Sequence, residues 1–210
     1  LDDLDRVWSR CFDLLVPGGR LCIVVGDVCL ARRKTGRHYV VPLHADIAAR
    51  CQRLGYDYLT PILWHKIANA VTEVEGNGSS FLGKPYEPNA IIKNDIEYIL
   101  LLRKPGGYRQ PTAAQRQLSM IDKGDHSKWF RSIWTDLPGT STRKGHPAPF
   151  PTELAYRLIR MFSFLRIASC RCASTSGVSV PIRTSSSAVK NRAWNLRIVR
   201  VVPPTLHGGK

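Results

Sequence analysis

The stretch Leu15-Val-Pro-Gly-Gly-Arg-Leu-Cys-Ile-Val-Val-Gly-Asp27 decides the fold. Its Pro17-Gly18-Gly19 tripeptide ends one element, because proline and glycine favour a turn over a continuing helix. Residues 20–25 follow as a short, mostly apolar run, and Gly26-Asp27 ends it. Such a run predicts a strand that is covered on both faces, as in a parallel sheet.

The segment before this stretch has the pattern of an amphipathic helix. Between residues 2 and 15 the apolar side chains recur three or four positions apart, at Leu4, Val7, Trp8, Cys11, Phe12 and Leu15. This spacing places them on one face of a helix. The chain opens on Leu1, already within this helix, and shows no signal peptide, so we expect further residues upstream.

The segments after the stretch alternate between helix and strand. Residues 29–41 predict a basic loop, Pro42 opens a helix that ends near Leu54, and residues 58–65 and 96–103 predict strands around a polar loop. This order indicates an α/β fold. Because no helix separates the last two strands, we expect residues 96–103 to form an antiparallel strand at one edge of the sheet.

The remainder of the chain divides at changes in composition. After a first part over residues 1–104, residues 105–138 have little periodicity and predict a loop-rich linker or target-recognition segment. Residues 139–164 contain a proline-rich motif and a helix that runs to about Phe164. Residues 165–210 form a basic tail without clear periodicity, which we interpret either as disordered or as translated out of frame.

Charge points to a polyanionic partner. The formal net charge is +15, and the tail alone contributes +8 because it has 8 Lys and Arg and no Asp or Glu. Nucleic acid is the usual partner of such a chain. A basic tail that binds nothing would give the same pattern.

Cysteine spacing and hydropathy favour a cytoplasmic protein. Six cysteines without a disulfide framework predict reduced thiols. We expect no metal site, because Cys170-x-Cys172 lacks a second pair. No apolar run approaches the roughly 18 residues that a membrane helix needs.

Three stretches together resemble the DNA amino-methyltransferases of bacterial modification systems. They are Arg10–Asp27, Lys84–Lys104 and Gly139–Phe164. Their order is similar to that of the permuted members, in which the catalytic half precedes a target-recognition region and the cofactor half. The resemblance implies a partial Rossmann-like sheet of the S-adenosylmethionine-dependent methyltransferases, with helices on both faces. It also implies methyl transfer to the exocyclic amino group of adenine or cytosine in double-stranded DNA.

The resemblance leaves the catalytic residues unassigned. The family's catalytic tetrapeptide (Asp, Asn or Ser, then Pro-Pro and an aromatic) belongs before residue 1. Asp27 ends the first strand, but we interpret it as a group that caps the following loop. The family's Asp-Pro-Phe and Gly-x-Gly turn would follow Phe164, where the basic tail stands instead.

The proline-rich motif is the best candidate for cofactor contacts. It reads His146-Pro-Ala-Pro-Phe-Pro151, and its predicted contacts with S-adenosylmethionine are His146, Pro147, Phe150 and Pro151. Prolines stiffen an extended segment and leave carbonyls unpaired. The N-terminus of the following helix offers free amides that suit a carboxylate. A rigid loop that only docks the helix is the alternative.

Basic side chains in two regions are candidates for DNA contacts. The predicted DNA-binding residues are Arg32, Arg33, Lys34 and Arg37 in the basic loop and Lys128, Arg143 and Lys144 near two tryptophans. In doubly wound folds, loops that follow strands lie near the substrate cleft. A solvated charged loop and a local aromatic core are the alternatives.

Two other functions fit the same scaffold. One is a catalytically inactive nucleic-acid-binding remnant, and the other is a different S-adenosylmethionine-dependent methyltransferase. For the favoured function, double-stranded DNA is the expected partner, and a cognate restriction endonuclease is a further candidate.

Overall fold

The computed structural model describes residues 1–66, 81–82, 84, 86–92, 94–108, 110–139, 151–165 and 194–201. The helices of these ranges are α1 (Asp2–Leu14), α2 (Arg32–Thr35), α3 (Leu43–Arg53), α5 (Ala113–Leu118), α6 (Lys123–Trp129) and α7 (Thr152–Phe162). The strands are β1 (Leu15–Val25), β2 (Val28–Leu30), β3 (Tyr39–Val41), β4 (Asp57–His65), β5 (Phe81–Leu82), β6 (Ile91–Ile92), β7 (Ile96–Arg103), β8 (Ile133–Trp134) and β9 (Trp194–Val201). None of the described helices is long and apolar enough to cross a membrane.

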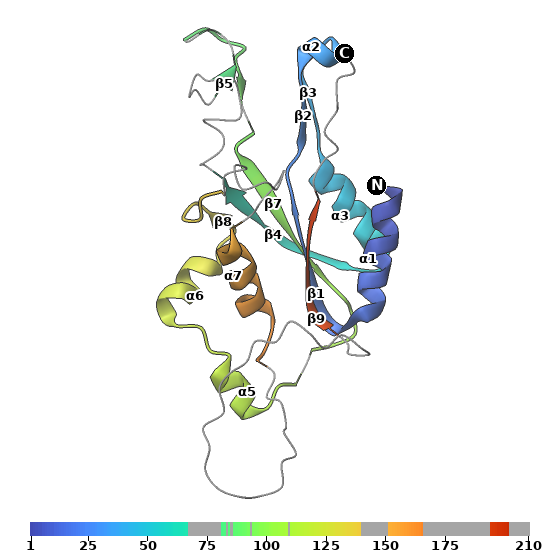
Figure 1. The fold of residues 1–210 in the computed structure, drawn as a ribbon, viewed down its shortest axis with the longest axis vertical. Helices are drawn as coiled ribbons and strands as arrows, with labels where there is room; N and C mark the ends of the chain where they lie inside the picture. Colours follow the sequence, from blue (N-terminus) through green and yellow to red (C-terminus); the bar gives the residue numbers. More distant parts are fainter. Residues whose placement is uncertain are drawn as a thin grey trace, which may run out of the picture.

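The main sheet has five strands in the order β8-β4-β7-β1-β9 (Figure 1). β1 and β4 each pair antiparallel with β7, whereas β9 lies parallel to β1 and β8 lies parallel to β4. Four strands therefore run in one direction and β7 alone runs in the other. β1 and β4 consequently end at the same edge of the sheet.

Both faces of the sheet are covered, which explains the continuous apolar runs of its strands. Leu21 and Ile23 of β1 face a core that also contains Trp8 of α1 and Ile47 of α3. Their neighbours Cys22 and Val24 face a second core with α6 and α7, because side chains alternate across a strand. The α/β fold with helices on both faces is confirmed.

The antiparallel direction of residues 96–103 is confirmed, but their expected place at an edge is wrong. β7 is the central strand of the sheet and lies between β1 and β4. Its residues Ile99, Leu100, Leu101 and Leu102 are all buried. A run that is apolar on both faces belongs inside a sheet, since an edge strand exposes part of its backbone.

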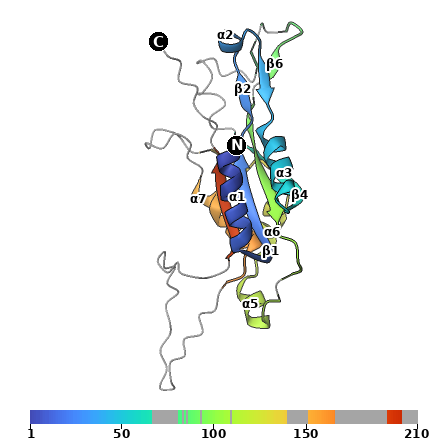
Figure 2. The same cartoon turned by 90° about the vertical axis from the view of Figure 1, so that its right-hand side faces the viewer.

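The basic stretch over residues 29–41 is a hairpin arm rather than a loop. β2 pairs antiparallel with β3, and the short helix α2 lies at its tip. Val28–Val41 is called the basic arm below. Figures 1 and 2 show it rising from the end of the sheet at which β1 terminates.

Several regular elements lie where periodicity predicted none. β5 and β6 form a small hairpin within the expected polar loop. α5, α6 and β8 lie within the expected loop-rich segment, and a capping box formed by Thr112 and Gln115 begins α5. β9 lies within the basic tail. Each of these elements is short or depends on a distant partner, so local periodicity carries little signal for it.

Candidate functional site

Polar side chains gather where β1 and β4 end, on either side of the start of β7. Asp27 follows β1, and His65 and Lys66 are the last residue of β4 and the one after it. Asp95 and Glu97 flank the first residue of β7. The Lys66 backbone N–H donates to the Asp95 carbonyl at 2.9 Å, which holds these two chain segments together. Ligands of doubly wound α/β folds bind outside the carboxyl ends of the strands. This edge is therefore the candidate site.

Asp27 and His44 form a close pair at this edge. Both carboxylate oxygens of Asp27 lie 2.8 Å from Nδ1 of His44, and the His44 backbone N–H donates to the same carboxylate at 3.2 Å. Because a carboxylate only accepts, Nδ1 carries the proton. The His44 ring also stacks on Tyr98 of β7, with centroids 3.8 Å apart. Asp27 thus caps α3 as well as holding the imidazole.

A second set of charged pairs lies at the end of β4. His65 Nε2 is 3.0 Å from a carboxylate oxygen of Asp95, and Lys66 Nζ donates to Glu97 at 3.2 Å. The Lys66–Glu97 pair is largely buried. The stem of Lys66 packs against Gly139, where an added Cβ would lie 2.7 Å from Lys66 Cγ. This contact fixes the position of Gly139, which precedes the predicted cofactor motif in the sequence.

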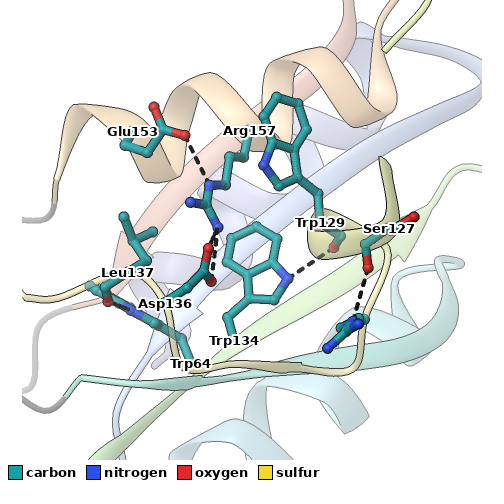
Figure 3. A network of polar contacts seen from close by, with 9 residues as sticks. Trp64, Ser127, Trp129, Trp134, Asp136, Leu137, Glu153 and Arg157 are labelled. Carbon is teal, nitrogen blue, oxygen red and sulfur yellow. Dashed lines mark hydrogen bonds and ion pairs between the residues drawn. The ribbon is translucent and has the colours of Figure 1, made fainter. Parts of the chain in front are cut away.

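A network around Arg157 joins the segments on both sides of that motif (Figure 3). The buried Arg157 of α7 donates to Asp136 at 3.1 Å and to Glu153 at 2.9 Å. Its guanidinium lies 5.4 Å from the centre of the Trp134 ring. Trp134 in turn donates to the backbone carbonyl of Trp129. Arg157 therefore holds the chain before residue 140 to the chain after residue 150.

The N-terminus of α7 points toward the candidate edge. Its last residues, including Phe162, line a cavity of about 440 Å³ together with Pro17 and Gly18 at the start of β1. The opposite end of the helix therefore lies toward the ends of β1 and β4. Pro151 is the N-cap of α7, and among the described residues no side-chain cap hydrogen bond is formed there.

The other predicted cofactor contacts, His146, Pro147 and Phe150, lie outside the described residues. The same holds for Arg143 and Lys144 among the predicted DNA contacts. Pro151, at the start of α7, can thus be placed, and its extended backbone fits a segment that leads into a helix.

The predicted DNA-binding residues of the basic arm lie together. Arg32, Arg33 and Lys34 form most of α2 and are exposed, and the Arg37 guanidinium lies 5.2 Å from the centre of the Tyr39 ring. Lys128 is exposed on α6, which Figure 1 shows at the left of the view, well below the arm at the top. The structure therefore groups the first four and separates Lys128 from them.

His44, Tyr98 and Arg157 were missed as site residues by sequence reasoning. His44 is a lone histidine in the sequence, and its partner Asp27 lies 17 positions away, so no local pattern joins the two. The usable signal was a carboxylate at a strand end and a histidine in the first turn of the helix that follows Pro42. Among the described residues, no group of three or more His, Cys, Asp or Glu could hold a metal ion.

Comparison with known families identifies the scaffold. Residues 1–166 match the model of the N6 and N4 methyltransferases, described as DNA methylase. This match covers most of the chain and includes β1, β4, β7 and α7. The chain belongs to the N6/N4 DNA methylase family.

Two curated relatives of this DNA methylase chain are type II methyltransferases. M.MthZI of Methanothermobacter thermautotrophicus is 34% identical over 174 residues, which are 78% of this chain and 46% of the relative. M.MjaI of Methanocaldococcus jannaschii is 36% identical over 167 residues, which are 76% of this chain and 51% of the relative. The DNA methylase chain thus spans about half the length of the curated relatives it matches.

A solved structure supports the same assignment. TTHA0409 of Thermus thermophilus, designated a DNA modification methylase, is 56% identical to the DNA methylase chain and superposes with a TM-score of 0.64. The similarity covers 78% of this chain and 58% of TTHA0409, whose crystals contain S-adenosyl-L-methionine. A structure of TTHA0409 that is not named as a complex gives 55% identity and a TM-score of 0.62.

Proposed function

We propose that this DNA methylase chain takes part in transferring a methyl group from S-adenosylmethionine to an exocyclic amino group of adenine or cytosine in double-stranded DNA. The family match over residues 1–166 carries the proposal. The likeness to TTHA0409, which was crystallised with the cofactor, supports the choice of methyl donor. The polar edge at the ends of β1 and β4 supplies a place for the reaction.

The chemistry asks the protein for positioning more than for a strong base. The lone pair of the amino nitrogen is conjugated with the ring, so the nitrogen must be held in line with the methyl group. The cofactor supplies that methyl group as an activated sulfonium. His146, Pro147, Phe150 and Pro151 would hold its methionine end beside the N-terminus of α7, whose free amides suit a carboxylate. Arg157 holds the chain on both sides of this motif.

Duplex DNA would be held through its phosphates by the basic arm. Arg32, Arg33, Lys34 and Arg37 give the arm four cationic side chains, and the arm contains no Asp or Glu. Contacts of this kind fix the position of the protein on DNA without selecting a sequence. Lys128, Arg143 and Lys144 are proposed as a separate group of contacts.

A restriction endonuclease that recognises the same sequence is the proposed further partner. Both curated relatives are named type II methyltransferases. The enzyme would then protect the sites that such a nuclease cuts, and the two would act on DNA in the cytoplasm.

The test measures transfer of a labelled methyl group from S-adenosylmethionine to duplex DNA. The chain is assayed alone and mixed with the part of TTHA0409 to which it does not align, because it covers 58% of that protein. We expect weak cofactor binding alone and transfer in the mixture, with N6-methyladenine or N4-methylcytosine found after DNA digestion. DNA binding without transfer in either assay would instead favour the inactive nucleic-acid-binding remnant.

A further inference from the structure

We propose that Asp27, His44 and Tyr98, called the root cluster below, are positioning residues that set the direction of the basic arm and thereby its hold on duplex DNA. The inference rests on the proposed function, because it gives the arm a DNA partner. It adds a role in DNA binding for three residues, of which the sequence suggested a role only for Asp27, as a cap of the following loop.

Among the described residues, the strands of the basic arm give it little support of their own. β2 and β3 form three residue pairs with each other, and their two-stranded sheet includes no other described strand. Every residue from Ala31 to Arg37, at the tip, is exposed. A two-stranded hairpin is marginally stable by itself in water. Contacts at its root therefore help to set the direction of the arm.

The root cluster closes the arm at the point where both of its strands join the sheet. Asp27 directly precedes β2, and His44 lies three residues after the end of β3. The two 2.8 Å contacts of Nδ1 and the 3.2 Å bond from the His44 backbone join these ends. The Asp27 side chain is only 9% exposed, so water competes weakly for its oxygens.

Tyr98 connects this closure to the centre of the sheet. Its ring stacks on the His44 ring with an angle of 9° between the two planes. Tyr98 lies on β7, where it pairs with Val25 of β1 and Leu63 of β4. A stacked ring resists tilting of its neighbour. The direction of the arm is thereby tied to β7, the central strand of the sheet.

The arm's direction matters for DNA because its cations lie at the tip. A phosphate backbone is contacted by several side chains at once only when the arm lies along it. Each phosphate contact releases counterions and steepens the dependence of affinity on salt. An arm that swings about its root keeps its charge but holds fewer phosphates at a time.

The experiment compares His44→Ala with His44→Asn, whose amide N–H can still donate to Asp27. Hydrogen exchange of the backbone amides over residues 28–41 reports the arm, and the Kd for a duplex at several salt concentrations reports binding. We expect His44→Ala to speed arm exchange and weaken duplex binding about 5- to 10-fold, with a salt slope shallower by about one. His44→Asn keeps the bond to Asp27 but loses the stack on Tyr98, so it should restore both properties in part.

A second background separates positioning from general loss of structure. The triple variant Arg32→Ala, Arg33→Ala, Lys34→Ala removes the cations of α2 but leaves the root cluster intact. Adding His44→Ala to it should change duplex affinity less than about 2-fold, because coupled residues are not additive. If His44→Ala still weakens duplex binding about 5- to 10-fold in the triple variant, His44 does not act through the cations of α2, and the inference is wrong.

His65→Ala is the matched control, since it removes the imidazole of the other His–Asp pair at this edge. It should leave exchange over residues 28–41 unchanged. If arm exchange is unaltered in His44→Ala while the chain binds duplex, the root cluster is refuted and the proposed function stands. If the unmodified chain binds no duplex although His44→Ala loosens the arm, the proposed function fails and the DNA role of the cluster fails with it.

Discussion

Gly18 holds the turn before the central part of β1 in a conformation that favours glycine. Its φ is +75°, and an added Cβ would lie 2.5 Å from the Gly107 carbonyl oxygen. The Gly18 backbone N–H also donates to the Lys104 carbonyl at 2.8 Å, so the turn cannot shift freely. We expect Gly18→Ala to lower the free energy of unfolding by about 2 kcal/mol or more, measured by urea denaturation.

Gly36 provides the control for this prediction. Its φ is +76°, but no atom lies within 4 Å of an added Cβ. Gly36→Ala therefore reports the left-handed strain alone, about 1–2 kcal/mol. Equal losses in the two variants would show that the contact with Gly107 has no cost.

Burial should protect two thiols from alkylation. It raises the pKa of both Cys22 and Cys51 to about 12. The thiolate is the reactive form, so at a pH of about 8 almost all of each thiol stays protonated and unreactive. We expect iodoacetamide to modify the exposed Cys29 before either of them, as measured by mass spectrometry of peptides from the native chain. Modification of Cys22 at the rate of Cys29 would contradict the buried position of β1.

At the scale of elements, Arg157 joins α7 to the segment that follows β8. Replacing it with leucine removes hydrogen bonds to two carboxylates, Asp136 and Glu153. We expect Arg157→Leu to lower the free energy of unfolding by about 1–3 kcal/mol, since bonds to charged groups are the stronger ones. Thermal and urea unfolding measure the change.

Arg131→Leu is the comparison for Arg157. Arg131 is exposed and donates to the Ser127 carbonyl at the surface. Its replacement should change stability by no more than about 0.5 kcal/mol. If both variants lose the same amount, the buried network is not what holds α7 in place.

Sequence predicted the elements whose signal is local. The apolar stripe predicted α1, because it repeats within a few turns. Pro42 predicted the start of α3, because proline favours the first turn of a helix. The candidate site was harder to predict. Its pairs join residues that only the tertiary fold brings together, such as Asp27 with His44 and Asp136 with Arg157. The pairing of Asp27 with His44 is an example, since the hairpin of the basic arm lies between them and brings the two residues together.

At the scale of the whole molecule, the order of the strands was predicted least well. β7 was expected at an edge because no helix precedes it, yet it is central. The four consecutive apolar residues from Ile99 to Leu102, all buried in the structure, were the sequence signal for a central strand. β9 could not be anticipated, because its pairing with β1 joins residues more than 170 positions apart. Parallel pairing over such a distance leaves no trace in local periodicity.

The pairing of β9 with β1 gives the basic tail a testable place in the fold. Ile198 and Val199 lie opposite Cys22 and Ile23 in a parallel register. Alternate residues of an edge strand turn their N–H groups toward the neighbouring strand, so only one of these two positions donates to β1. We expect proline at that position to lower the free energy of unfolding by about 3 kcal/mol, and proline at the other to cost clearly less.

Ile198→Pro and Val199→Pro therefore serve as controls for each other. Both remove one backbone N–H and fix φ at the same value, so general effects of proline cancel in the comparison. Unequal losses in urea denaturation place the ladder between β1 and β9 in the folded protein. Equal and negligible losses would mean that the tail does not pair with β1, and that the sheet ends at β1 in solution.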